Sequence, residues 1–397
     1  MDITTKFSDK VKHLEASSIR EIFKLLAKPG IISFAGGAPD PELFPKQEFA
    51  KIAKEILEND GNTALQYGIT EGYVPLREWV KNRLISQGVL NENDNVIIVS
   101  GGQQGLDLCS KSLINPGDGV ICEEPSFIGG LNCFRSYNAE LFGVPVEEDG
   151  LDTEKLEQIL KENKNIKLLY TISTFQNPSG ITISAEKRKK ILELAEKYDI
   201  LIYEDNPYGE LRFSGEEIPT LKSMDKYGRV IYFGSFSKIL APGMRLGFTS
   251  APEALLERMI ICKQTQDVHT NVLSQMIAYK FLTENSIDEH IAKLREAYGK
   301  KCQLMIDCMD KYFPKTVKHT CPEGGLFLFC TMPDGYDSKE LMKKALEKNV
   351  AFVPGTSCMI DDKKTYSTFR MNYSTASEAD IETGVKALGE VLHEYLK

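Results

Sequence analysis

Short apolar runs alternate with longer stretches of helical periodicity through the first three quarters of the chain. The spacing of apolar residues predicts helices over residues 47–58 and 74–86, and the uninterrupted apolar run at residues 96–99 predicts a buried strand. Later predicted strands lie at residues 119–124, 140–146, 167–173, 199–205, 229–235 and 246–251, and helices at residues 106–114, 127–137, 151–163 and 184–199. Strands that alternate with helices of this length indicate an α/β fold with a mostly parallel sheet covered on both faces.

The pattern changes after Leu294. A long helical stretch at residues 290–313 precedes predicted strands at residues 324–332, 350–355 and 367–374 and helices at residues 338–349 and 377–396, which is typical of a smaller α+β unit. We therefore expect an amino-terminal arm with part of the small domain at residues 1–44, a large domain at residues 45–294 and a small carboxyl-terminal domain at residues 295–397. The arm is expected to pack between the two domains.

The chain has 397 residues, of which 42% are apolar and 26% charged, as is typical of a globular protein with a large core. Its 48 basic and 57 acidic residues give a net charge of −9, which disfavours nucleic acid as a partner. No run of about 18 apolar residues occurs, so we expect no membrane span. The amino-terminal sequence is polar and lacks the apolar centre of a secretory signal, and we expect a cytoplasmic protein.

Nine cysteines are scattered along the chain, and none forms a CxxC pair. We expect reduced thiols, mostly buried, in place of a disulfide framework or a zinc site. The five histidines include no HExxH pair, so we expect no metal held by the protein, although ligands from distant positions stay open. Neither GxxxxGKS/T nor GxGxxG occurs, which removes support for the two nucleotide-binding folds that these motifs mark.

Candidate chemistry lies at the carboxyl ends of the predicted strands, where open α/β sheets bind their ligands. Residues 100–104, Ser-Gly-Gly-Gln-Gln, connect a strand to a helix. Free backbone N–H groups at the start of that helix, beside small residues, suit a phosphate group. A tight turn between strand and helix, with no ligand, is the alternative.

Lys238 follows the predicted strand at residues 229–235, and Arg245 follows in the same segment. A lysine amine forms Schiff bases with carbonyl compounds once burial or a neighbouring cation lowers its pKa. Arginine suits a bidentate contact with phosphate. The ordinary alternative is a solvated lysine, which composition alone favours.

Asp205 ends the apolar run at residues 199–205, and a carboxylate at the end of a buried strand needs a cation nearby. The pyridinium nitrogen of pyridoxal phosphate is such a cation, and the charge pair strengthens the ring as an electron sink. Tyr208, and Asn177 in an Asn-Pro-Ser-Gly turn, are candidate donors to the ring hydroxyl. A turn with a capping aspartate is the alternative.

Two further residues suit a cofactor ring and a substrate. Phe127 lies just past a predicted strand, where an aromatic side chain can stack on a planar ring, and core packing is its ordinary explanation. Arg370 lies in a strand-like segment among apolar and aromatic residues. A buried arginine needs an anion, which is either a substrate carboxylate or a structural salt-bridge partner.

In their order along the chain, the motifs SGGQQGL, EEPSF, QNPSG, YEDNPY, SFSK with APGMRLG, and FRMNYS resemble those of class I/II aminotransferases. The resemblance covers essentially the whole chain and implies fold type I, the fold of many pyridoxal-phosphate enzymes. Residues 18–22 and 32–45 resemble the branch that holds 2-aminoadipate and kynurenine/aminoadipate aminotransferases, together with the catalytic half of MocR-type regulators.

The resemblance implies a role for each matching residue. Lys238 would hold the cofactor as a Schiff base and, once freed by the substrate, move the proton between substrate and cofactor. Asp205 would pair with the ring nitrogen, Asn177 and Tyr208 would bind the ring hydroxyl, and Phe127 would stack on the ring. The phosphate would be bound by Gly102, Gln103, Ser235, Ser237 and Arg245, and by Tyr67 from the second copy of an obligate homodimer. The substrate would be bound by Arg370, Asn177, Gly37 and Arg20.

Two residues depart from the family pattern. Phe127 stands where many members have a tyrosine, so stacking is kept without a hydrogen bond from that ring. Gly102 stands where a hydroxyl residue is common, so one phosphate contact would come from the backbone alone. Neither change affects the proton transfer.

The resemblance implies ping-pong transfer of an amino group to a 2-oxo acid, with 2-oxoglutarate as the expected acceptor and pyridoxamine phosphate as the intermediate form of the cofactor. Expected donors are 2-aminoadipate, glutamate, and aromatic and branched amino acids, since Arg20 matches a mobile arginine that meets a distal carboxylate. A surface or interface salt bridge is the alternative for Arg20. A β-eliminating lyase on the same scaffold and, more remotely, a MocR-like sensor are the alternative functions.

Overall fold

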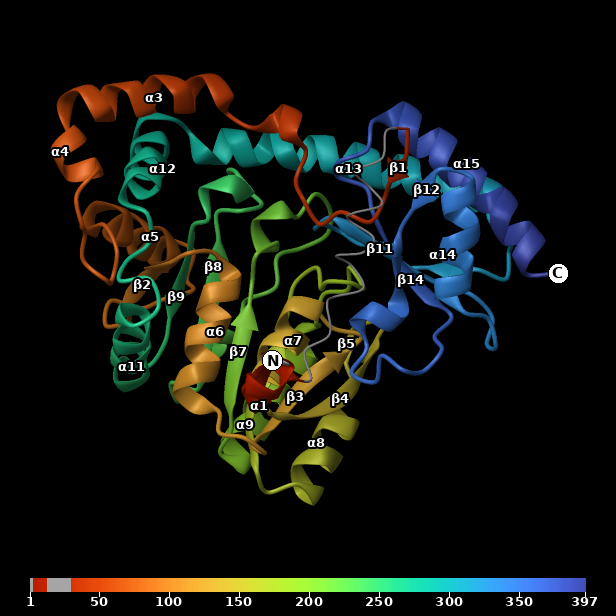
Figure 1. Ribbon diagram of the computed structural model, residues 1–397, viewed down its shortest axis with the longest axis horizontal. Coiled ribbons are helices and arrows are strands. Elements are labelled where there is room, and N and C mark those ends of the chain that lie inside the picture. Colours follow the sequence, from red (N-terminus) through yellow and green to blue (C-terminus); the bar gives the residue numbers. More distant parts are fainter. Residues whose placement is uncertain (1–2, 13–29) are drawn as a thin grey trace.

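The computed structural model describes residues 3–12 and 30–397, and its central feature is an eight-stranded sheet (Figure 1). In spatial order the strands are β2 (Val96–Val99), β9 (Gly247–Ser250), β8 (Val230–Ser235), β7 (Leu201–Asp205), β6 (Ile166–Thr171), β3 (Gly119–Glu124), β4 (Glu140–Glu147) and β5 (Gly150–Leu151). The five strands from β8 to β4 form one parallel block. The α/β fold predicted from the alternating pattern is confirmed.

β9 runs antiparallel to both of its neighbours, β8 and β2, although the pattern alone favoured a parallel arrangement. Residues 236–246 connect β8 to β9 through a short 3-10 helix, η4 (Pro242–Met244). A parallel pair needs a crossover of about a dozen residues or more, usually a full helix, and this connection has none. Because two antiparallel pairings follow one another, β2 points the same way as the parallel block.

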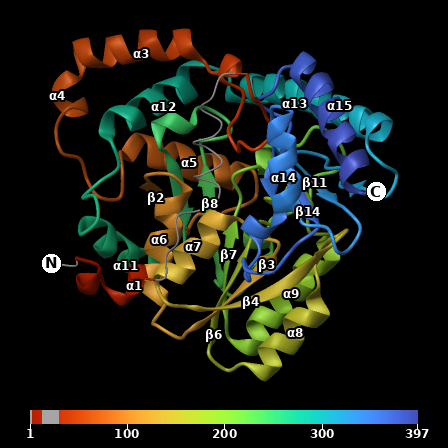
Figure 2. The same cartoon turned by 45° about the vertical axis from the view of Figure 1, so that its right-hand side comes forward.

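Helices cover both faces of the sheet (Figures 1 and 2). One face carries α6 (Gly102–Leu113), α7 (Ile128–Ser136) and α11 (Glu253–Gln264), and the other carries α8 (Thr153–Glu162), α9 (Ala185–Tyr198) and α10 (Leu221–Met224). Successive residues of a strand supply opposite faces: Val120 belongs to the larger core, and Ile121 to the smaller core beneath α8 and α9.

A group of helices packs at the β2 side of the sheet (Figure 1). It contains α3 (Lys46–Asn59), α4 (Gly61–Ala64), α5 (Val74–Ser86) and α12 (Val272–Glu284). The helices predicted over residues 47–58 and 74–86 are confirmed as α3 and α5. In α5 the buried residues Leu76, Val80 and Leu84 follow helical spacing and face the sheet core.

The carboxyl-terminal part forms a second, smaller sheet. Its antiparallel strands, in order, are β10 (Lys318–His319), β11 (Phe327–Thr331), β14 (Thr368–Asn372) and β13 (Val353–Pro354). The helices of this part are α13 (Ile287–Tyr312), α14 (Ser338–Glu347) and α15 (Glu378–Tyr395), and short elements elsewhere are η1 (Ile3–Lys6), α1 (Asp9–Lys12), η2 (Pro41–Leu43), η3 (Gly209–Leu211) and η5 (Gly355–Cys358). α13 packs along α15, as both ribbon views show.

The apolar run at residues 350–355 was predicted as one strand, but it supplies two sheets. β12 (Val350–Ala351) pairs in parallel with β1 (Ile32–Ser33), whereas β13 joins the four-stranded sheet. Phe352, between the two strands, is fully buried and packs against Phe369. A uniformly apolar run does not show which strand each of its residues pairs with, so the pattern could not predict the division into β12 and β13.

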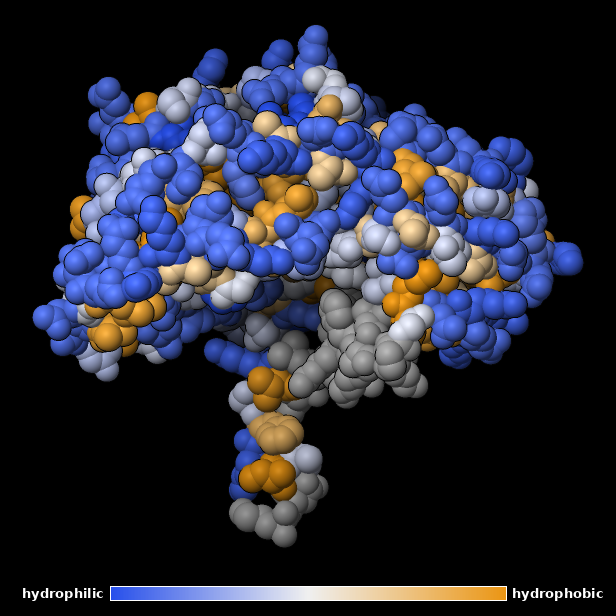
Figure 3. Space-filling model, turned by 90° about the horizontal axis from the view of Figure 1, so that it is seen from above, coloured by the Kyte–Doolittle hydropathy of each residue, from blue (hydrophilic) through white to orange (hydrophobic). Residues whose placement is uncertain are grey.

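All nine cysteines are unpaired, and most of them are buried, which confirms the expectation of reduced thiols. Figure 3 looks onto the α3 and α13 side, where hydrophilic residues dominate and apolar residues reach the surface in separate patches. Across residues 3–12 and 30–397, none of the helices combines the length and the apolar character needed to cross a bilayer.

Candidate active site

The loops that follow β2, β3, β6, β7 and β8 meet at one edge of the large sheet and enclose a cavity of about 410 Å³. This volume lies within the range of small-molecule sites. Twelve residues proposed from the sequence line the cavity: Gly37, Gly102, Gln103, Phe127, Asn177, Asp205, Tyr208, Ser235, Ser237, Lys238, Arg245 and Arg370. The fold thus gathers side chains from the amino-terminal segment, the large sheet and the small sheet.

Lys238 follows the end of β8, and its side chain reaches across the cavity. Its Nζ donates a hydrogen bond to the carbonyl oxygen of Gly37 at 2.7 Å. Burial lowers the pKa of the Lys238 amine to about 8, and the positive charges of Arg370 and Arg245 act in the same direction. A lysine with a lowered pKa has a substantial uncharged fraction near neutral pH, which is the nucleophilic form.

Asp205 is the last residue of β7 and is buried. Its Oδ2 accepts a hydrogen bond from the Tyr170 hydroxyl at 2.8 Å, whereas Oδ1 is buried and has no partner in the part of the chain that the structure describes. Burial raises the pKa of Asp205 to about 7, while the Tyr170 hydrogen bond and the Lys238 charge oppose that shift. A buried, unpaired carboxylate oxygen at a cavity wall suits a ligand N–H group.

Arg370 projects from β14 of the small sheet into the same cavity and is buried. Its Nη1 donates to Asn177 Oδ1 at 2.8 Å and its Nη2 to the Ala35 carbonyl oxygen at 2.6 Å, and its guanidinium lies 4.4 Å from the centre of the Phe327 ring. Within residues 3–12 and 30–397, both hydrogen-bond partners of Arg370 are uncharged oxygens, and its buried Nε has no acceptor. No salt bridge within the described part of the chain accounts for this arginine, and its unpaired Nε suits an anionic ligand.

The connection from β2 to α6 forms the opposite wall. Gly101 has φ +83°, and a Cβ there would lie 2.4 Å from Arg245 Nη2, so glycine lets the guanidinium approach the backbone. Arg245 Nη2 in turn donates to the Ser100 carbonyl oxygen at 3.3 Å. The first N–H groups of α6, at Gly102 and Gln103, have no partner within the helix. This wall combines a cation and helix N–H groups, the features of a phosphate site.

Gly102 is also explained by packing. A Cβ at this position would lie 2.8 Å from the Phe233 ring, which is too close for any real side chain. A serine or threonine at this position would therefore require the Phe233 ring to move. Ser235 and Ser237, on the same side of the cavity, are linked by a hydrogen bond from the Ser237 N–H to Ser235 Oγ at 3.1 Å.

Asn177 and Tyr208 lie next to each other on the floor of the cavity. The Asn177 amide donates to the Tyr208 hydroxyl at 3.5 Å, and both residues are buried. Burial raises the pKa of Tyr208 above its ordinary value, which keeps the hydroxyl protonated. Half-buried Phe127, the residue before α7, presents its ring to the cavity.

Residue patterns missed the groups that support these side chains. Glu123, at the end of β3, is buried and accepts hydrogen bonds from the Thr171 hydroxyl at 2.7 Å and from Gln176 Nε2 at 3.1 Å. Gln176 also donates to the Pro125 carbonyl oxygen at 2.7 Å, so it joins the loop that carries Phe127 to the loop that carries Asn177. The one available signal was a second carboxylate in the EEPSF motif at the end of an apolar strand.

One predicted residue lies outside this cavity, and another falls on a part of the chain that the structure does not describe. Tyr67 is 81% exposed, and its ring meets the His269 ring edge-on with 5.8 Å between centres. Arg20 lies outside the described residues.

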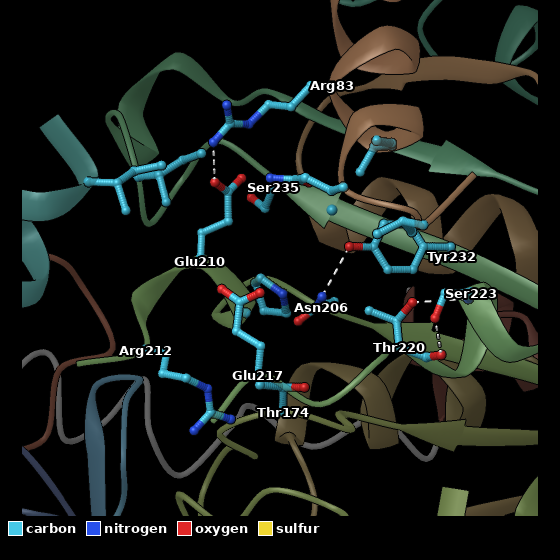
Figure 4. A pocket seen from close by; sticks show the side chains of 18 of the residues that line it. Arg83, Thr174, Asn206, Glu210, Arg212, Glu217, Thr220, Ser223, Tyr232 and Ser235 are labelled. Carbon is cyan, nitrogen blue, oxygen red and sulfur yellow. Dashed lines mark hydrogen bonds and ion pairs between the residues drawn. The ribbon is translucent and has the colours of Figure 1, made fainter. Parts of the chain in front are cut away.

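A second cavity, of about 700 Å³, lies on the other side of the segment that follows β7 (Figure 4). There Arg83 faces Glu210 with 2.6 Å between Nη2 and Oε2, and Asn206 Nδ2 donates to the Tyr232 hydroxyl at 3.0 Å. Of the proposed site residues that the structure describes, Ser235 alone also lines this second cavity. These contacts support the residues that follow Asp205 on the side facing the second cavity.

Residues 31–388 match the family model described as aminotransferase class I and II. The chain is 41% identical to the aromatic-amino-acid aminotransferase 1 of Thermococcus litoralis, over 100% of this chain and 96% of that protein. It superposes on the crystal structure of Pyrococcus horikoshii kynurenine aminotransferase, in complex with PMP, with a TM-score of 0.96, 40% identity and 100% and 99% of the two chains covered. For Thermus thermophilus α-aminoadipate aminotransferase, complexed with N-(5'-phosphopyridoxyl)-L-leucine, the TM-score is 0.92 at 38% identity, covering 100% and 99%.

The chain therefore belongs to the class I and II aminotransferases. It is a transaminase of fold type I that uses pyridoxal phosphate, which confirms the family, activity and cofactor predicted from the motifs. The cavity fits this cofactor, because the unpaired Oδ1 of Asp205 offers an acceptor for the ring nitrogen and Lys238 offers an amine for the aldehyde. Relatives at 33–41% identity are named as aminotransferases, whereas two HTH-type transcriptional regulators of Bacillus subtilis match at 30% and 31% over 77% of their length, so the comparisons do not favour the lyase or the regulator alternative.

Proposed function

We propose that the cavity residues divide the work of transamination as their motifs predict. Pyridoxal phosphate, when bound, supplies an aldehyde carbon that exchanges amino groups and a ring that accepts electrons. Asp205 would pair with its ring nitrogen, Asn177 and Tyr208 would bind its ring hydroxyl, and Phe127 would stack on the ring. Its phosphate would be held by Gly102, Gln103, Ser235, Ser237 and Arg245.

Lys238 would be the group that binds the aldehyde and then moves the substrate proton at its Nζ. The single observation that carries this proposal is the half-buried Lys238 amine, whose pKa is lowered to about 8 in a cavity that also contains Asp205 and Arg370. With a pKa of about 8, Nζ can both accept and release a proton near neutral pH without a large free-energy penalty in either direction.

Arg370 would bind the α-carboxylate of the amino acid, assisted by Asn177, and Gly37 would line the substrate pocket. The hydrogen bond from Arg370 to Asn177 Oδ1 holds the guanidinium in position before the substrate arrives. The Gly37 carbonyl oxygen, which accepts a hydrogen bond from Lys238, would keep the amine on the substrate side of the cavity. These contacts orient the reacting atoms and so reduce the entropy lost on reaching the transition state.

The experiment that tests the role of Lys238 is a single-turnover assay with glutamate on purified variants. Lys238→Ala should fold and give no detectable transamination. Lys222→Ala is a matched control, because Lys222 is also a buried lysine but pairs with Asp94 outside the cavity. Near wild-type turnover in Lys238→Ala would refute the assignment.

The donors are proposed to be 2-aminoadipate, glutamate, and aromatic and branched amino acids, with 2-oxoglutarate as the acceptor. Relatives named for aromatic amino acids, kynurenine and α-aminoadipate support this breadth. Arg20 would meet the distal carboxylate of acidic donors. An activity matrix of donors against acceptors, measured for the wild type and for Arg20→Ala, tests this role of Arg20. The variant should lose activity selectively with acidic donors. An unchanged preference between acidic and apolar donors would exclude the role of Arg20.

A homodimer is proposed, with the active sites at the subunit interface and Tyr67 reaching the phosphate bound by the other copy. Leu65, Tyr67, Ile69 and Val268 are large apolar side chains that are each about half exposed or more. The contact between the Tyr67 and His269 rings brings the two segments together into one apolar surface. Contiguous exposed apolar surface of this kind marks a protein interface. We also propose a cytoplasmic location. The proposed domain boundaries lie after residues 44 and 294, which gives three domains.

A further inference from the structure

Tyr170 lies beside the carboxylate that the proposed function assigns to the cofactor nitrogen. It is on β6, where it pairs with Tyr203 of β7, and Asp205 lies at the end of β7. The Tyr170 side chain is fully buried, and its hydroxyl donates a hydrogen bond to Asp205 Oδ2 at 2.8 Å. Among the described residues this is the one hydrogen bond made by the Asp205 carboxylate.

The two carboxylate oxygens of Asp205 therefore have different surroundings. Oδ2 is anchored by the hydroxyl, and Oδ1 is left without a partner although it too is buried. Rotation of the carboxylate would break the hydrogen bond, so the anchored oxygen also fixes the direction of the free one. The other ionisable groups around Asp205 are Lys238, Glu123, Tyr203 and Tyr208, and none of them donates a hydrogen bond to it.

The Tyr170 ring is held in place independently of its hydroxyl. It packs edge-on against Phe134 of α7, with 5.5 Å between ring centres. A Cβ at Gly130, also in α7, would lie 2.9 Å from Tyr170 Cε1, so the helix backbone closes directly over the ring. Removal of the hydroxyl is therefore expected to leave the ring where it is.

We propose that Tyr170 is a positioning residue for the cofactor, whose hydroxyl holds Asp205 Oδ2 and thereby aims Oδ1 at the pyridine nitrogen. This inference rests on the proposed role of Asp205. Tyr170 acts through that carboxylate and does not line the cavity itself. A hydrogen bond to a carboxylate also favours its ionised form, which is the form that pairs with a protonated ring nitrogen.

Tyr203 provides a matched control on the neighbouring strand. It is as fully buried as Tyr170, and the two ring centres lie 6.0 Å apart. Its hydroxyl, however, has no hydrogen-bond partner among the described residues. Tyr203→Phe thus removes the same atom from the same core without removing a contact to Asp205.

The experiment measures the binding of pyridoxamine phosphate to the apoenzyme by fluorescence titration, because this form binds without a covalent link to Lys238. Tyr170→Phe should raise its Kd about tenfold or more, as expected for loss of a hydrogen bond to a charged group. Tyr203→Phe should change the Kd less than about twofold, because no hydrogen bond is lost. Equal Kd values for the two variants would overturn the proposal.

Asp205→Asn and the double variant separate positioning from a general structural effect. Asp205→Asn alone should weaken binding strongly, and adding Tyr170→Phe to it should cause little further change, because the hydroxyl acts through the carboxylate. If Tyr170→Phe has the same effect in both backgrounds, it acts on the structure instead, and the positioning role is excluded while that of Asp205 stands. An unchanged Kd in Asp205→Asn alone would remove the proposed role of Asp205, and the inference with it.

Discussion

Two buried polar atoms of the cavity, Asp205 Oδ1 and Arg370 Nε, have no hydrogen-bond partner in the described part of the chain, and the Lys238 amine beside them has a lowered pKa. Unpaired buried polar groups destabilise a fold, so their persistence together points to a ligand that satisfies them. The ligand must bring an electrophilic carbon, a ring N–H and a carboxylate. Pyridoxal phosphate and an amino acid bring all three.

The lowered pKa of Lys238 predicts a specific pH dependence of stability in the apoenzyme. Between the native pKa of about 8 and the ordinary value of 10.5, the unfolded chain binds the proton that the folded chain has lost, so stability rises with pH. Below about pH 8 the Lys238 amine is charged in the folded protein, and the full free-energy cost of burying that charge lowers the stability. Lys238→Met removes this charge and should stabilise the apoenzyme near neutral pH. We expect a gain of about 2 kcal/mol, which is less than the full pKa shift implies because the side chain is partly exposed to solvent.

The measurement is urea denaturation of both apoenzymes across this pH range. The difference in the free energy of unfolding should shrink toward zero as the pH approaches 10.5. Asp205 and Glu123, whose pKa values are raised to about 7, titrate below this window and contribute little to the slope within it. A constant difference at all pH values would show that the Lys238 amine has an ordinary pKa.

Arg370→Lys keeps the charge at the carboxylate site but loses the planar, bidentate contact. We expect kcat/KM for every amino donor to fall by about a hundredfold, since a buried charge-assisted contact is lost. The Kd of pyridoxamine phosphate should stay within about twofold, because the effect falls on substrate binding. A parallel loss of cofactor affinity would place Arg370 in the cofactor site instead.

Residue patterns predicted side chains that line the cavity but not the side chains that support them. Lys238 and Asp205 were recognisable because they stand at or just past the ends of apolar strands, and Arg370 because it is a charged residue within one. Tyr170 and Glu123 lie within or at the end of apolar strands too, but their importance depends on strand register and on what the neighbouring strand brings opposite them. A single strand's sequence does not contain that information.

In the β2–α6 connection, Gly101→Ala is predicted to weaken phosphate binding through Arg245. The substitution combines a strained φ of +83° with a Cβ 2.4 Å from the guanidinium. Gly117→Ala is a close control, because Gly117 has φ +85° and nothing within 4 Å of the added Cβ. Both variants should lose about 1 kcal/mol or more of stability from backbone strain.

Only Gly101→Ala should also raise the Kd of pyridoxal phosphate, by about tenfold or more, because the displaced arginine loses its phosphate geometry. Equilibrium dialysis of the two apoenzymes with the cofactor measures the difference. Equal cofactor affinity in the two variants would contradict the placement of Arg245 at the phosphate.

The apolar pattern predicted helix bounds better than it predicted the directions and partners of the strands. α5 was predicted with its observed bounds, because its helical spacing and the glycine after its end are local signals. The antiparallel direction of β9 and the split between β12 and β13 depend on connection length and on distant partner strands. Such non-local pairings are decided by packing, which local propensity does not report.

The cavity is completed only when the whole chain is folded. Arg370 comes from the small sheet, Gly37 from the amino-terminal segment and Asp205 from the large sheet. The Ser126 N–H donates to the Cys358 carbonyl oxygen at 2.7 Å and so ties a loop of the large sheet to η5 near the site. Substrate binding and the packing of the two sheets are therefore linked.

At the proposed dimer interface, Leu65→Lys should shift the protein from dimer to monomer in sedimentation velocity and weaken cofactor binding. Leu65 is 75% exposed on the surface formed with Tyr67, Ile69 and Val268, so a charge there would be buried on dimerisation. Tyr227→Lys is the control, since Tyr227 is 62% exposed but precedes β8, at the opposite edge of the sheet from the cavity. If Leu65→Lys remains a dimer, this surface does not form the dimer interface.

The most direct test traps the link between enzyme and cofactor with borohydride and maps it by peptide mass spectrometry. In the wild-type holoenzyme the pyridoxyl-phosphate mass should be found on the peptide that contains Lys238, and it should be missing from Lys238→Ala. A modified peptide that carries another lysine, or a protein that takes up no cofactor at all, would contradict the assignment of this cavity as the site of transamination.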